Sequence, residues 1–189
     1  MKFYLIRHGQ TEWNVDGKIQ GSTDIELNTE GLIQAAQLSE KIQNLNYPFS
    51  KIYSSPQQRA VQTAEILSRE TAIDYEVKDG LEEINLGEWE GLSWREVQDT
   101  YPQEFDQWLK NRKYTKPPKG ESYQEMIDRV LSALNKILRE TNEDAVIVTH
   151  SAVIMCLQCY LTNTPFEEMT KFKTENSSIT EIDAELLRV

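Results

Sequence analysis

Short apolar runs alternate with longer amphipathic stretches along this chain. Three runs are compact, largely apolar and bounded by polar or turn residues, at positions 3–6, 51–53 and 145–149. Such runs are typical of strands that are buried on both faces of a sheet. They predict three buried strands, spread across the whole length of the sequence.

Helical periodicity fills much of the sequence between these runs. Apolar residues fall mostly on one helical face over positions 32–45. Over positions 126–138 they are spaced three and four residues apart, which gives a more regular apolar stripe along one face of a helix. Three local signals mark helix starts. They are the capping boxes Ser122 with Glu125 and Ser93 with Glu96, and Ser55 as a cap before Pro56.

The order strand, helix, strand, helix predicts a three-layer α/β/α sandwich with a largely parallel central sheet. Positions 178–183 and 185–189 are expected to add a terminal hairpin or edge strands. The length of 189 residues fits one domain over 1–189, because domains usually span about 100–200 residues. Functional sites in such folds lie beyond the carboxyl ends of the strands, so the residues that follow the strands are the first candidates.

The net charge of the chain limits the kinds of molecule that it is expected to bind. The formal net charge is −11, with 31 acidic and 20 basic residues. This field disfavours binding to nucleic acid and to anionic membranes. No apolar run approaches the roughly 20 residues of a membrane-spanning helix. An anionic substrate would therefore need a local cluster of cations.

Two cysteines, Cys156 and Cys159, match the C-x-x-C spacing of redox and zinc sites. A zinc site needs further ligands, and the sequence has no second pair. The surrounding stretch 152–160 is largely apolar, so it predicts a core helix with two buried thiols. The few cysteines and the absence of a signal sequence favour a reducing cytoplasm. A homodimer is left open.

The sequence contains two histidines, and both follow predicted strands. His8 comes just after the first strand, next to Arg7, and His150 comes directly after the run at 145–149. Their placement alone leaves open whether they share a site. Arg59 lies in the first turns of a predicted helix, where the macrodipole disfavours a cation. A phosphate held between it and the helix amides would explain this position, and a solvated surface arginine is the alternative.

These residues belong to a longer pattern. The segment Leu-Ile-Arg-His-Gly-Gln-Thr-Glu-Trp-Asn at positions 5–14 strongly resembles the signature of the histidine phosphatase superfamily, also called the phosphoglycerate mutase-like family. The resemblance continues, in the expected order, at positions 19–24, 27–31, 54–64, 81–91, 120–122 and 148–150. A single Arg-His-Gly would be a weak signal, but several motifs in the right order make a specific match.

The resemblance implies a phosphoglycerate mutase-like fold and a phosphomonoesterase that acts on a small phosphorylated metabolite. His8 would take the phosphoryl group as a phosphohistidine, which water then hydrolyses. Arg7 and Arg59 would hold the charged phosphoryl oxygens, and His150, if protonated, would add a third donor. Asn14, Gln20 and the Gly21 backbone would complete the set of groups that bind the phosphate.

Glu83 is the expected general acid and base. In the family's pattern the acid lies four residues before a glycine, and Glu83 stands four residues before Gly87. Such a carboxyl group needs a raised pKa to hold its proton near neutral pH. Glu82 is expected to be a solvated loop residue. The sequence has no metal-ligand spacing, so we expect an acid or neutral histidine phosphatase with neither metal nor cofactor.

Two positions depart from the family's pattern. Ser151 stands where glycine is common after the second histidine, and it is expected to contact the substrate. Met155 replaces a common basic residue. Trp89 and Trp94 border the segment that is expected to cap the site, so either could face the substrate.

The mutases of the family carry an extra segment, rich in basic residues, that holds a second phosphate. Here Arg112, Lys113, Lys116 and Lys119 come later and are expected to face solvent. A phosphatase is therefore favoured over a cofactor-dependent phosphoglycerate mutase, which stays the alternative. A non-catalytic regulatory protein on this fold is a weaker alternative, because no core motif residue is lost.

Overall fold

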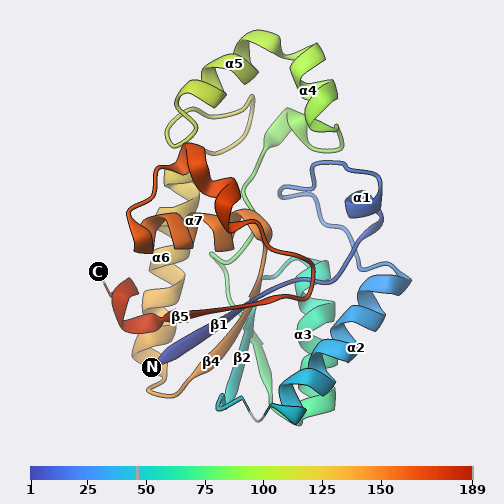
Figure 1. The fold of residues 1–189 in the computed structure, drawn as a ribbon, viewed down its shortest axis with the longest axis vertical. Helices are drawn as coiled ribbons and strands as arrows, with labels where there is room; N and C mark the ends of the chain where they lie inside the picture. Colours follow the sequence, from blue (N-terminus) through green and yellow to red (C-terminus); the bar gives the residue numbers. More distant parts are fainter. Residues whose placement is uncertain (46, 189) are drawn as a thin grey trace.

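The computed structural model describes residues 1–45 and 47–188, and a five-stranded sheet forms its centre (Figure 1). The strand order is β3-β2-β4-β1-β5. β1 and β2 both pair in parallel with β4, β3 pairs in parallel with β2, and β5 runs antiparallel to β1. The strands are Lys2–Arg7 (β1), Lys51–Ser54 (β2), Tyr75–Val77 (β3), Ala145–Thr149 (β4) and Ile179–Asp183 (β5). The predicted fold class, with its largely parallel sheet, is confirmed.

Helices cover both faces of the sheet. They are α2 (Thr29–Asn44) and α3 (Gln58–Thr71) on one face, and α6 (Tyr123–Glu140) and α7 (Ser151–Thr162) on the other. Side chains of β4 alternate between two cores because strand residues point to opposite faces. Val146 and Val148 join the core under α2 and α3, while Ala145 and Ile147 join the core under α6 and α7. This double burial explains why the strands are continuous apolar runs in the sequence.

The capping signals had different outcomes. Ser122 and Ser93 form the predicted capping boxes at the starts of α6 and α4 (Trp94–Thr100). The prediction for Ser55 is wrong, because α3 begins at Gln58 with Gln57 as its N-cap residue. The Ser55 hydroxyl instead lies 2.8 Å from Nε2 of His150. The Ser55 hydroxyl thus contacts the histidine that follows β4 instead of capping α3.

The C-terminal segment forms one of the two predicted strands. β5 is an antiparallel edge strand, as expected. The second prediction is wrong, because Ala184–Leu187 forms a short 3-10 helix (η3). Ala184 and Leu187 are spaced by three residues and both are buried, so this turn inserts two apolar side chains into the core. Val189 lies outside the described residues.

Two helices stand beyond the carboxyl ends of the parallel strands. Figure 1 shows α4 and α5 (Pro102–Lys110) at the end of the molecule opposite the amino-terminal ends of β2 and β4. A ring cluster attaches them to the 3-10 helix η1 (Gly87–Trp89), with Trp89 5.3 Å from Trp108 and 6.0 Å from Phe105 between centroids. Edge-to-face contacts of this kind favour a fixed arrangement. The cluster therefore holds α4 and α5 over the strand ends.

Two smaller elements border the same region, α1 (Glu12–Val15) and the 3-10 helix η2 (Phe166–Phe172). The buried helix predicted around the cysteines is α7, and Cys156 and Cys159 are both free and buried. Within residues 1–45 and 47–188, no helix is both long enough and apolar enough to cross a membrane.

The packing between α6 and the sheet predicts a stability difference. Leu134 on α6 has no exposed surface, so Leu134→Ala is expected to lower the free energy of unfolding by about 2–5 kcal/mol. Leu32→Ala on α2 is the matched control. Its side chain is exposed, so a change within roughly 0.5 kcal/mol is expected. Urea denaturation followed by circular dichroism measures both. Equal midpoints for Leu134→Ala and the parent protein would contradict this account of the core.

Candidate active site

The two histidines emerge side by side from neighbouring strands. β1 and β4 pair in parallel with Arg7 opposite Thr149, so the next residue of each strand is a histidine. The rings of His8 and His150 are buried, with centroids 5.3 Å apart. The backbone N–H of His8 donates to the Thr149 carbonyl at 3.1 Å, which extends the hydrogen-bond ladder between β1 and β4 by one residue. The sheet thus brings together two residues that are far apart in the sequence.

Hydrogen bonding assigns the tautomer of His8. Its Nδ1 lies 2.7 Å from the Gly9 carbonyl oxygen, which can only accept a hydrogen bond. Nδ1 therefore carries the proton, and the lone pair of the neutral ring is on Nε2. Burial, and then the charges of Arg59 and Arg7, lower the pKa of His8 well below its ordinary value. The ring is neutral at pH 7 and can act as a nucleophile.

Two arginines lie beside this ring, of which Arg59 is buried and Arg7 is half-buried. Arg59 donates from Nη1 to the Thr23 carbonyl and from Nη2 to the Gly21 carbonyl, both at 2.8 Å. Arg7 donates from Nη1 to the Thr174 carbonyl at 2.5 Å. In both arginines Nε is buried and has no partner among the described residues. Burial lowers the pKa of Arg59 to about 10, so the guanidinium stays charged at neutral pH. Two such cations favour an anion at this place.

The surroundings of His150 determine its charge, which the sequence left open. Burial, followed by the charges of Arg59 and His8, lowers the pKa of His150 well below its ordinary value. The ring is therefore neutral at pH 7 before an anion binds. Its Nε2 bonds with Ser55, and its Nδ1 is buried without a partner in the described part of the chain. A dianion nearby would raise the pKa again, because it stabilises the protonated form.

Glu83 has the environment of an acid that retains its proton. Burial raises its pKa, although two backbone N–H groups oppose the shift. These donors are Ala152, in the first turn of α7, to Oε2 at 3.1 Å, and Ile84 to Oε1 at 3.0 Å. The side chain is therefore held in one orientation. The raised pKa agrees with the role expected from the sequence.

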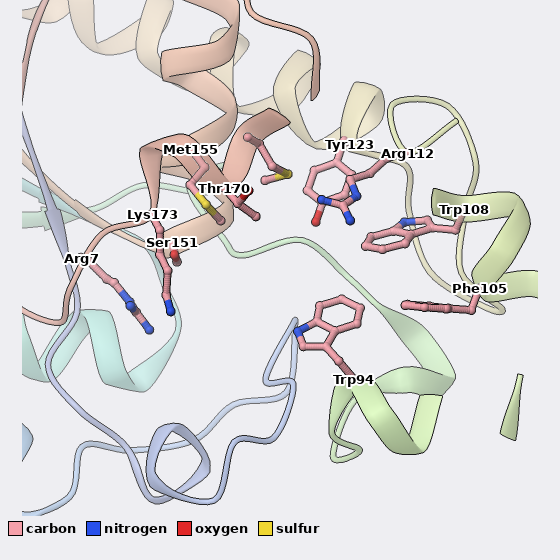
Figure 2. A pocket seen from close by; sticks show the side chains of 11 residues that line it. Arg7, Trp94, Phe105, Trp108, Arg112, Tyr123, Ser151, Met155, Thr170 and Lys173 are labelled. Carbon is pink, nitrogen blue, oxygen red and sulfur yellow. The ribbon is translucent and has the colours of Figure 1, made fainter. Parts of the chain in front are cut away.

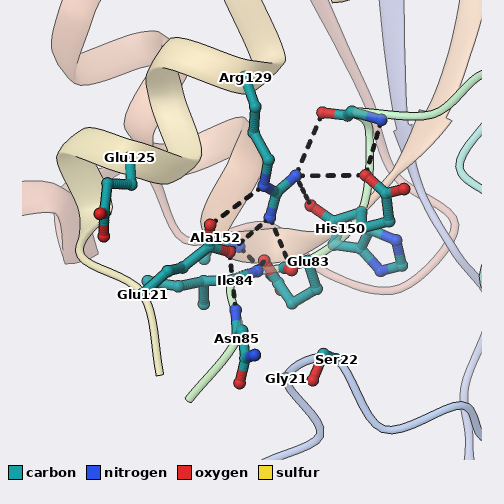
Figure 3. Close-up of polar contacts among 12 residues, drawn as sticks. Gly21, Ser22, Glu83, Ile84, Asn85, Glu121, Glu125, Arg129, His150 and Ala152 are labelled. Carbon is teal, nitrogen blue, oxygen red and sulfur yellow. Dashed lines mark hydrogen bonds and ion pairs between the residues drawn. The ribbon is translucent and has the colours of Figure 1, made fainter. Parts of the chain in front are cut away.

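A polar network on α6 fixes the loop that carries Glu83 (Figure 3). Arg129 donates to the carbonyls of Glu82 at 2.8 Å and Glu83 at 2.9 Å, and to Oε1 of Glu121 at 2.6 Å. The same Glu121 oxygen accepts the N–H of Asn85 at 2.9 Å. The prediction that Glu82 is solvated is wrong, because its carboxylate accepts the N–H of Gly80 at 2.7 Å and lies 3.4 Å from Arg129. Sequence reasoning missed Arg129, since no motif includes it.

A second carboxylate ties the loop at 20–23 to the Glu83 loop. Glu90 accepts the N–H groups of Ser22 at 2.8 Å and Leu86 at 3.0 Å. Gly21 lies between these contacts with φ +52°, and a Cβ there would come within 2.2 Å of Oε1 of Glu90. Only glycine fits this turn. Gln57 adds a bridge, since it donates to the Gly21 carbonyl and accepts the Glu83 N–H. Gln57 lies inside a quoted motif, but its role was not anticipated.

The predicted residues converge on one cavity of about 220 Å³. Eight of them line it: Arg7, His8, Asn14, Gln20, Gly21, Arg59, Glu83 and Ser151. The ninth, His150, is fully buried and lies beside His8, with the two rings tilted by 56°. Of the two tryptophans considered, Trp94 lines the cavity and Trp89 is buried in the ring cluster. No group of three or more metal-ligating side chains occurs among the residues that the structure describes.

Comparison with known proteins matches this site to a family. The family model for the histidine phosphatase superfamily (branch 1) matches residues 3–186, and the chain belongs to this family. The phosphoserine phosphatase of Entamoeba histolytica, solved with 3-phosphoglyceric acid, is 32% identical with a TM-score of 0.83 and is covered over 89% of its length by 95% of this chain. A mycobacterial glucosyl-3-phosphoglycerate phosphatase, solved with VO3, is 27% identical with a TM-score of 0.84, over 96% of this chain and 92% of that chain.

A longer relative is 6-phosphofructo-2-kinase/fructose-2,6-bisphosphatase 3 of Rattus norvegicus, 35% identical over 170 residues. The match includes 90% of this chain, which spans only 29% of that protein's length. The predicted family is confirmed. A phosphatase activity appears in the name of each of these relatives, in agreement with the predicted phosphatase branch.

The Arg129 network predicts a kinetic effect at a distance. Arg129→Met is expected to lower kcat for a phosphomonoester by about 10-fold or more with little change in KM, because Glu83 would lose its orientation. Arg139→Met, on the exposed end of the same helix, is the matched control and is expected to leave both constants unchanged. Steady-state kinetics measure the two variants. Identical kcat values would show that the network does not act on the acid.

Proposed function

We propose that the chain is a metal-independent phosphomonoesterase that hydrolyses small phosphorylated metabolites through a phosphohistidine on His8. The observation that carries the proposal is the state of His8. Its proton is fixed on Nδ1 by the Gly9 carbonyl. The buried guanidinium of Arg59 and the half-buried guanidinium of Arg7 stand beside it, and the Nε of each has no partner among the described residues. A neutral nucleophile next to two fixed cations suits attack on a dianionic phosphoryl group.

In the first step, Nε2 of His8 attacks phosphorus and the P–O bond to the alcohol breaks. Arg7 and Arg59 balance the negative charge that spreads over the equatorial oxygens. The departing alkoxide takes the proton of Glu83, whose pKa is raised by burial. The products of this step are the free alcohol, the Glu83 carboxylate and the phosphohistidine.

In the second step, the Glu83 carboxylate takes a proton from water as the water oxygen attacks phosphorus. The P–N bond breaks and its electron pair returns to Nε2. Inorganic phosphate leaves, and Glu83 is again protonated. One carboxyl group therefore acts as the general acid in the first step and as the general base in the second.

The remaining lining residues would hold the phosphoryl group. Asn14 Oδ1 accepts hydrogen bonds from the backbone of Thr11 at 3.0 Å and from Asn176 at 3.3 Å, so its amide group is held at the cavity wall. Gln20 also lines the cavity, and its side-chain amide N–H groups are the donors that it could offer to a phosphoryl oxygen. Ser151 begins α7, where the helix dipole favours negative charge. These features support an anion cradle around His8.

Water must reach the phosphoenzyme in a phosphatase, whereas a mutase returns the phosphoryl group to its substrate. The names of the relatives favour the phosphatase. Release of inorganic phosphate from 3-phosphoglycerate, without a 2-phospho product, would distinguish the two.

We also propose the cytoplasm as the location, because the two cysteines of α7 are free and buried.

Loss of the nucleophile should abolish turnover. His8→Ala is expected to lower kcat/KM by roughly 10⁴-fold or more, because the neighbouring imidazole, His150, has its Nε2 in a hydrogen bond with Ser55 and does not replace the lost Nε2. Phosphate release from a panel of small esters measures it, with circular dichroism as the control for folding. The parent activity is expected to survive a chelator. Equal turnover by His8→Ala, or loss of parent activity in chelator, would contradict the mechanism.

The role of Glu83 predicts a dependence on the leaving group. Glu83→Gln is expected to slow hydrolysis of an alkyl phosphate by about 10²–10⁴-fold, and of 4-nitrophenyl phosphate far less, because nitrophenolate leaves without a proton. In the parent protein, alkyl ester hydrolysis falls as pH rises above the raised pKa of Glu83, since the acid form is lost.

This alkaline limb should disappear in Glu83→Gln and persist in the control Glu82→Gln. The pH profiles of kcat/KM test it. An equal loss for both esters in Glu83→Gln would indicate a structural role instead.

A further inference from the structure

The η2–β5 segment (residues 173–178) lies against the end of β1 and the histidine that follows it. The segment begins on the wall of a cavity of about 440 Å³ that shares Arg7 and Ser151 with the catalytic cavity. Figure 2 shows Lys173, the first residue of the segment, on the same side of this cavity as Arg7. The segment therefore borders the site from the C-terminal part of the chain.

The opposite wall of the same cavity includes Arg112. Its guanidinium carbon lies 4.3 Å from the ring centroid of Trp108, so the expectation that Arg112 faces solvent is wrong. Lys116 and Lys119 are at the surface as expected, and each forms an ion pair with a glutamate. Arg112 lies across the cavity from Arg7 (Figure 2), so the wall next to Arg7 is the one that borders the nucleophile.

Three hydrogen bonds join the η2–β5 segment to Arg7. The guanidinium donates from Nη1 to the Thr174 carbonyl at 2.5 Å, and the backbone N–H donates to the Ser178 carbonyl at 3.3 Å. The Arg7 carbonyl accepts the N–H of Ser177 at 2.9 Å. Ser177 has φ +55°, a left-handed conformation that is uncommon for residues other than glycine. The side chain of Asn176, just before this turn, contacts the nucleophile.

The Asn176 amide holds the backbone carbonyl of His8. Its Nδ2 donates to this carbonyl at 2.9 Å and to Oδ1 of Asn14 at 3.3 Å, which uses both of its hydrogens. The Ser177 N–H also reaches the His8 carbonyl, at a longer distance of 3.4 Å. Asn14 has a further support, because its Oδ1 accepts the backbone N–H of Thr11 at 3.0 Å. Asn176 does not line the catalytic cavity, so it acts on the reaction through His8.

Side chains hold the peptide groups on both sides of Gly9. In the peptide before it, the His8 carbonyl is bound by Asn176 and the N–H is bound by Oγ1 of Thr63 at 3.1 Å. The N–H of the peptide after it donates to Oε1 of Gln34 at 2.9 Å. Glycine alone has wide conformational freedom, so these contacts fix its backbone. In this fixed conformation the Gly9 carbonyl oxygen meets Nδ1 of His8.

We propose that Asn176 is a positioning residue that keeps the His8 ring in its nucleophilic tautomer. The amide holds the His8 carbonyl and so restricts rotation at Gly9, and the Gly9 carbonyl then retains the imidazole proton on Nδ1. The lone pair stays on Nε2, the atom that attacks phosphorus. This role rests on the proposed function, because it concerns the nucleophile of that reaction.

Nitrogen NMR measures the tautomer without turnover. Long-range proton–nitrogen spectra of the isotope-labelled protein contain ring signals from two histidines, and the spectrum of His8→Ala assigns those of His8. The parent protein is expected to show His8 protonated on Nδ1 and unprotonated on Nε2. Asn176→Leu has nearly the same volume but no N–H donor. Its two His8 nitrogen signals are expected to move toward each other, because the second tautomer becomes populated.

Steady-state kinetics give a second readout. Asn176→Leu is expected to lower kcat for 4-nitrophenyl phosphate by about 10-fold, because a smaller fraction of His8 presents its lone pair on Nε2. KM should stay nearly unchanged, because Thr11 still holds Asn14. Asn44→Leu, at an exposed position of α2, is the matched control and should match the parent in both spectrum and rate.

The parent protein offers a measurement that needs no variant. Both side-chain hydrogens of Asn176 are bonded, so they should exchange with solvent at least about 10-fold more slowly than those of exposed Asn44. This comparison decides the matter if circular dichroism shows that Asn176→Leu does not fold.

The outcomes separate this role from the proposed function. A parent-like tautomer in folded Asn176→Leu, even with a lowered kcat, would overturn the role of Asn176, and so would exchange of its amide at the Asn44 rate. Neither result bears on hydrolysis through His8. A shifted tautomer in the variant supports the role, and if the parent hydrolyses no ester, the proposed function alone is refuted.

Discussion

The parallel pairing of β1 with β4 is the constraint on which the site depends. Side chains alternate between the faces of a strand, so a slip of one residue would exchange the two cores and displace the residues that follow each strand. Both strands are buried on two faces, which leaves one register compatible with packing. In that register His8 emerges next to His150, and Ser55, at the end of β2, reaches His150 from the other side. Core packing therefore sets the distance between the side chains of His8 and His150.

Charge in the site is local and opposes the charge of the whole chain. Arg59 is buried and Arg7 is half-buried in a protein of net charge −11, and backbone carbonyls satisfy only part of each guanidinium. Burying such groups costs free energy, and an anionic ligand offsets that cost. The acidic side chains Glu90 and Glu121 accept backbone N–H groups in the surrounding loops, which holds the loops in place without neutralising the arginines. The site is thus organised before an anion binds.

The sequence was most informative where a local pattern matched a packed element. Buried strands, the amphipathic α6 and two capping boxes were all predicted, because each follows from short-range chemistry. The short exposed β3 and the terminal 3-10 helix were not, since tertiary contacts decide them. A homodimer and a single domain stay predictions.

Among the site residues, the motif positions converge, but their partners could not be inferred from order alone. Ser55 bonds His150 instead of capping a helix, and Arg129 reaches the Glu83 loop from 46 positions away. Arg112 was taken for a surface residue because nothing in the sequence indicates that it stacks on Trp108. Each of these contacts depends on the tertiary arrangement.

The proposed covalent step on His8 can be tested directly. The wild-type protein would be quenched in alkali during turnover of an ester with a good leaving group, and its peptides mapped by mass spectrometry. The account predicts a phosphoryl group on the peptide that contains His8, formed and consumed on the timescale of turnover. Phosphate on a different residue, or continued turnover without a phosphorylated peptide at any quench time, would contradict it.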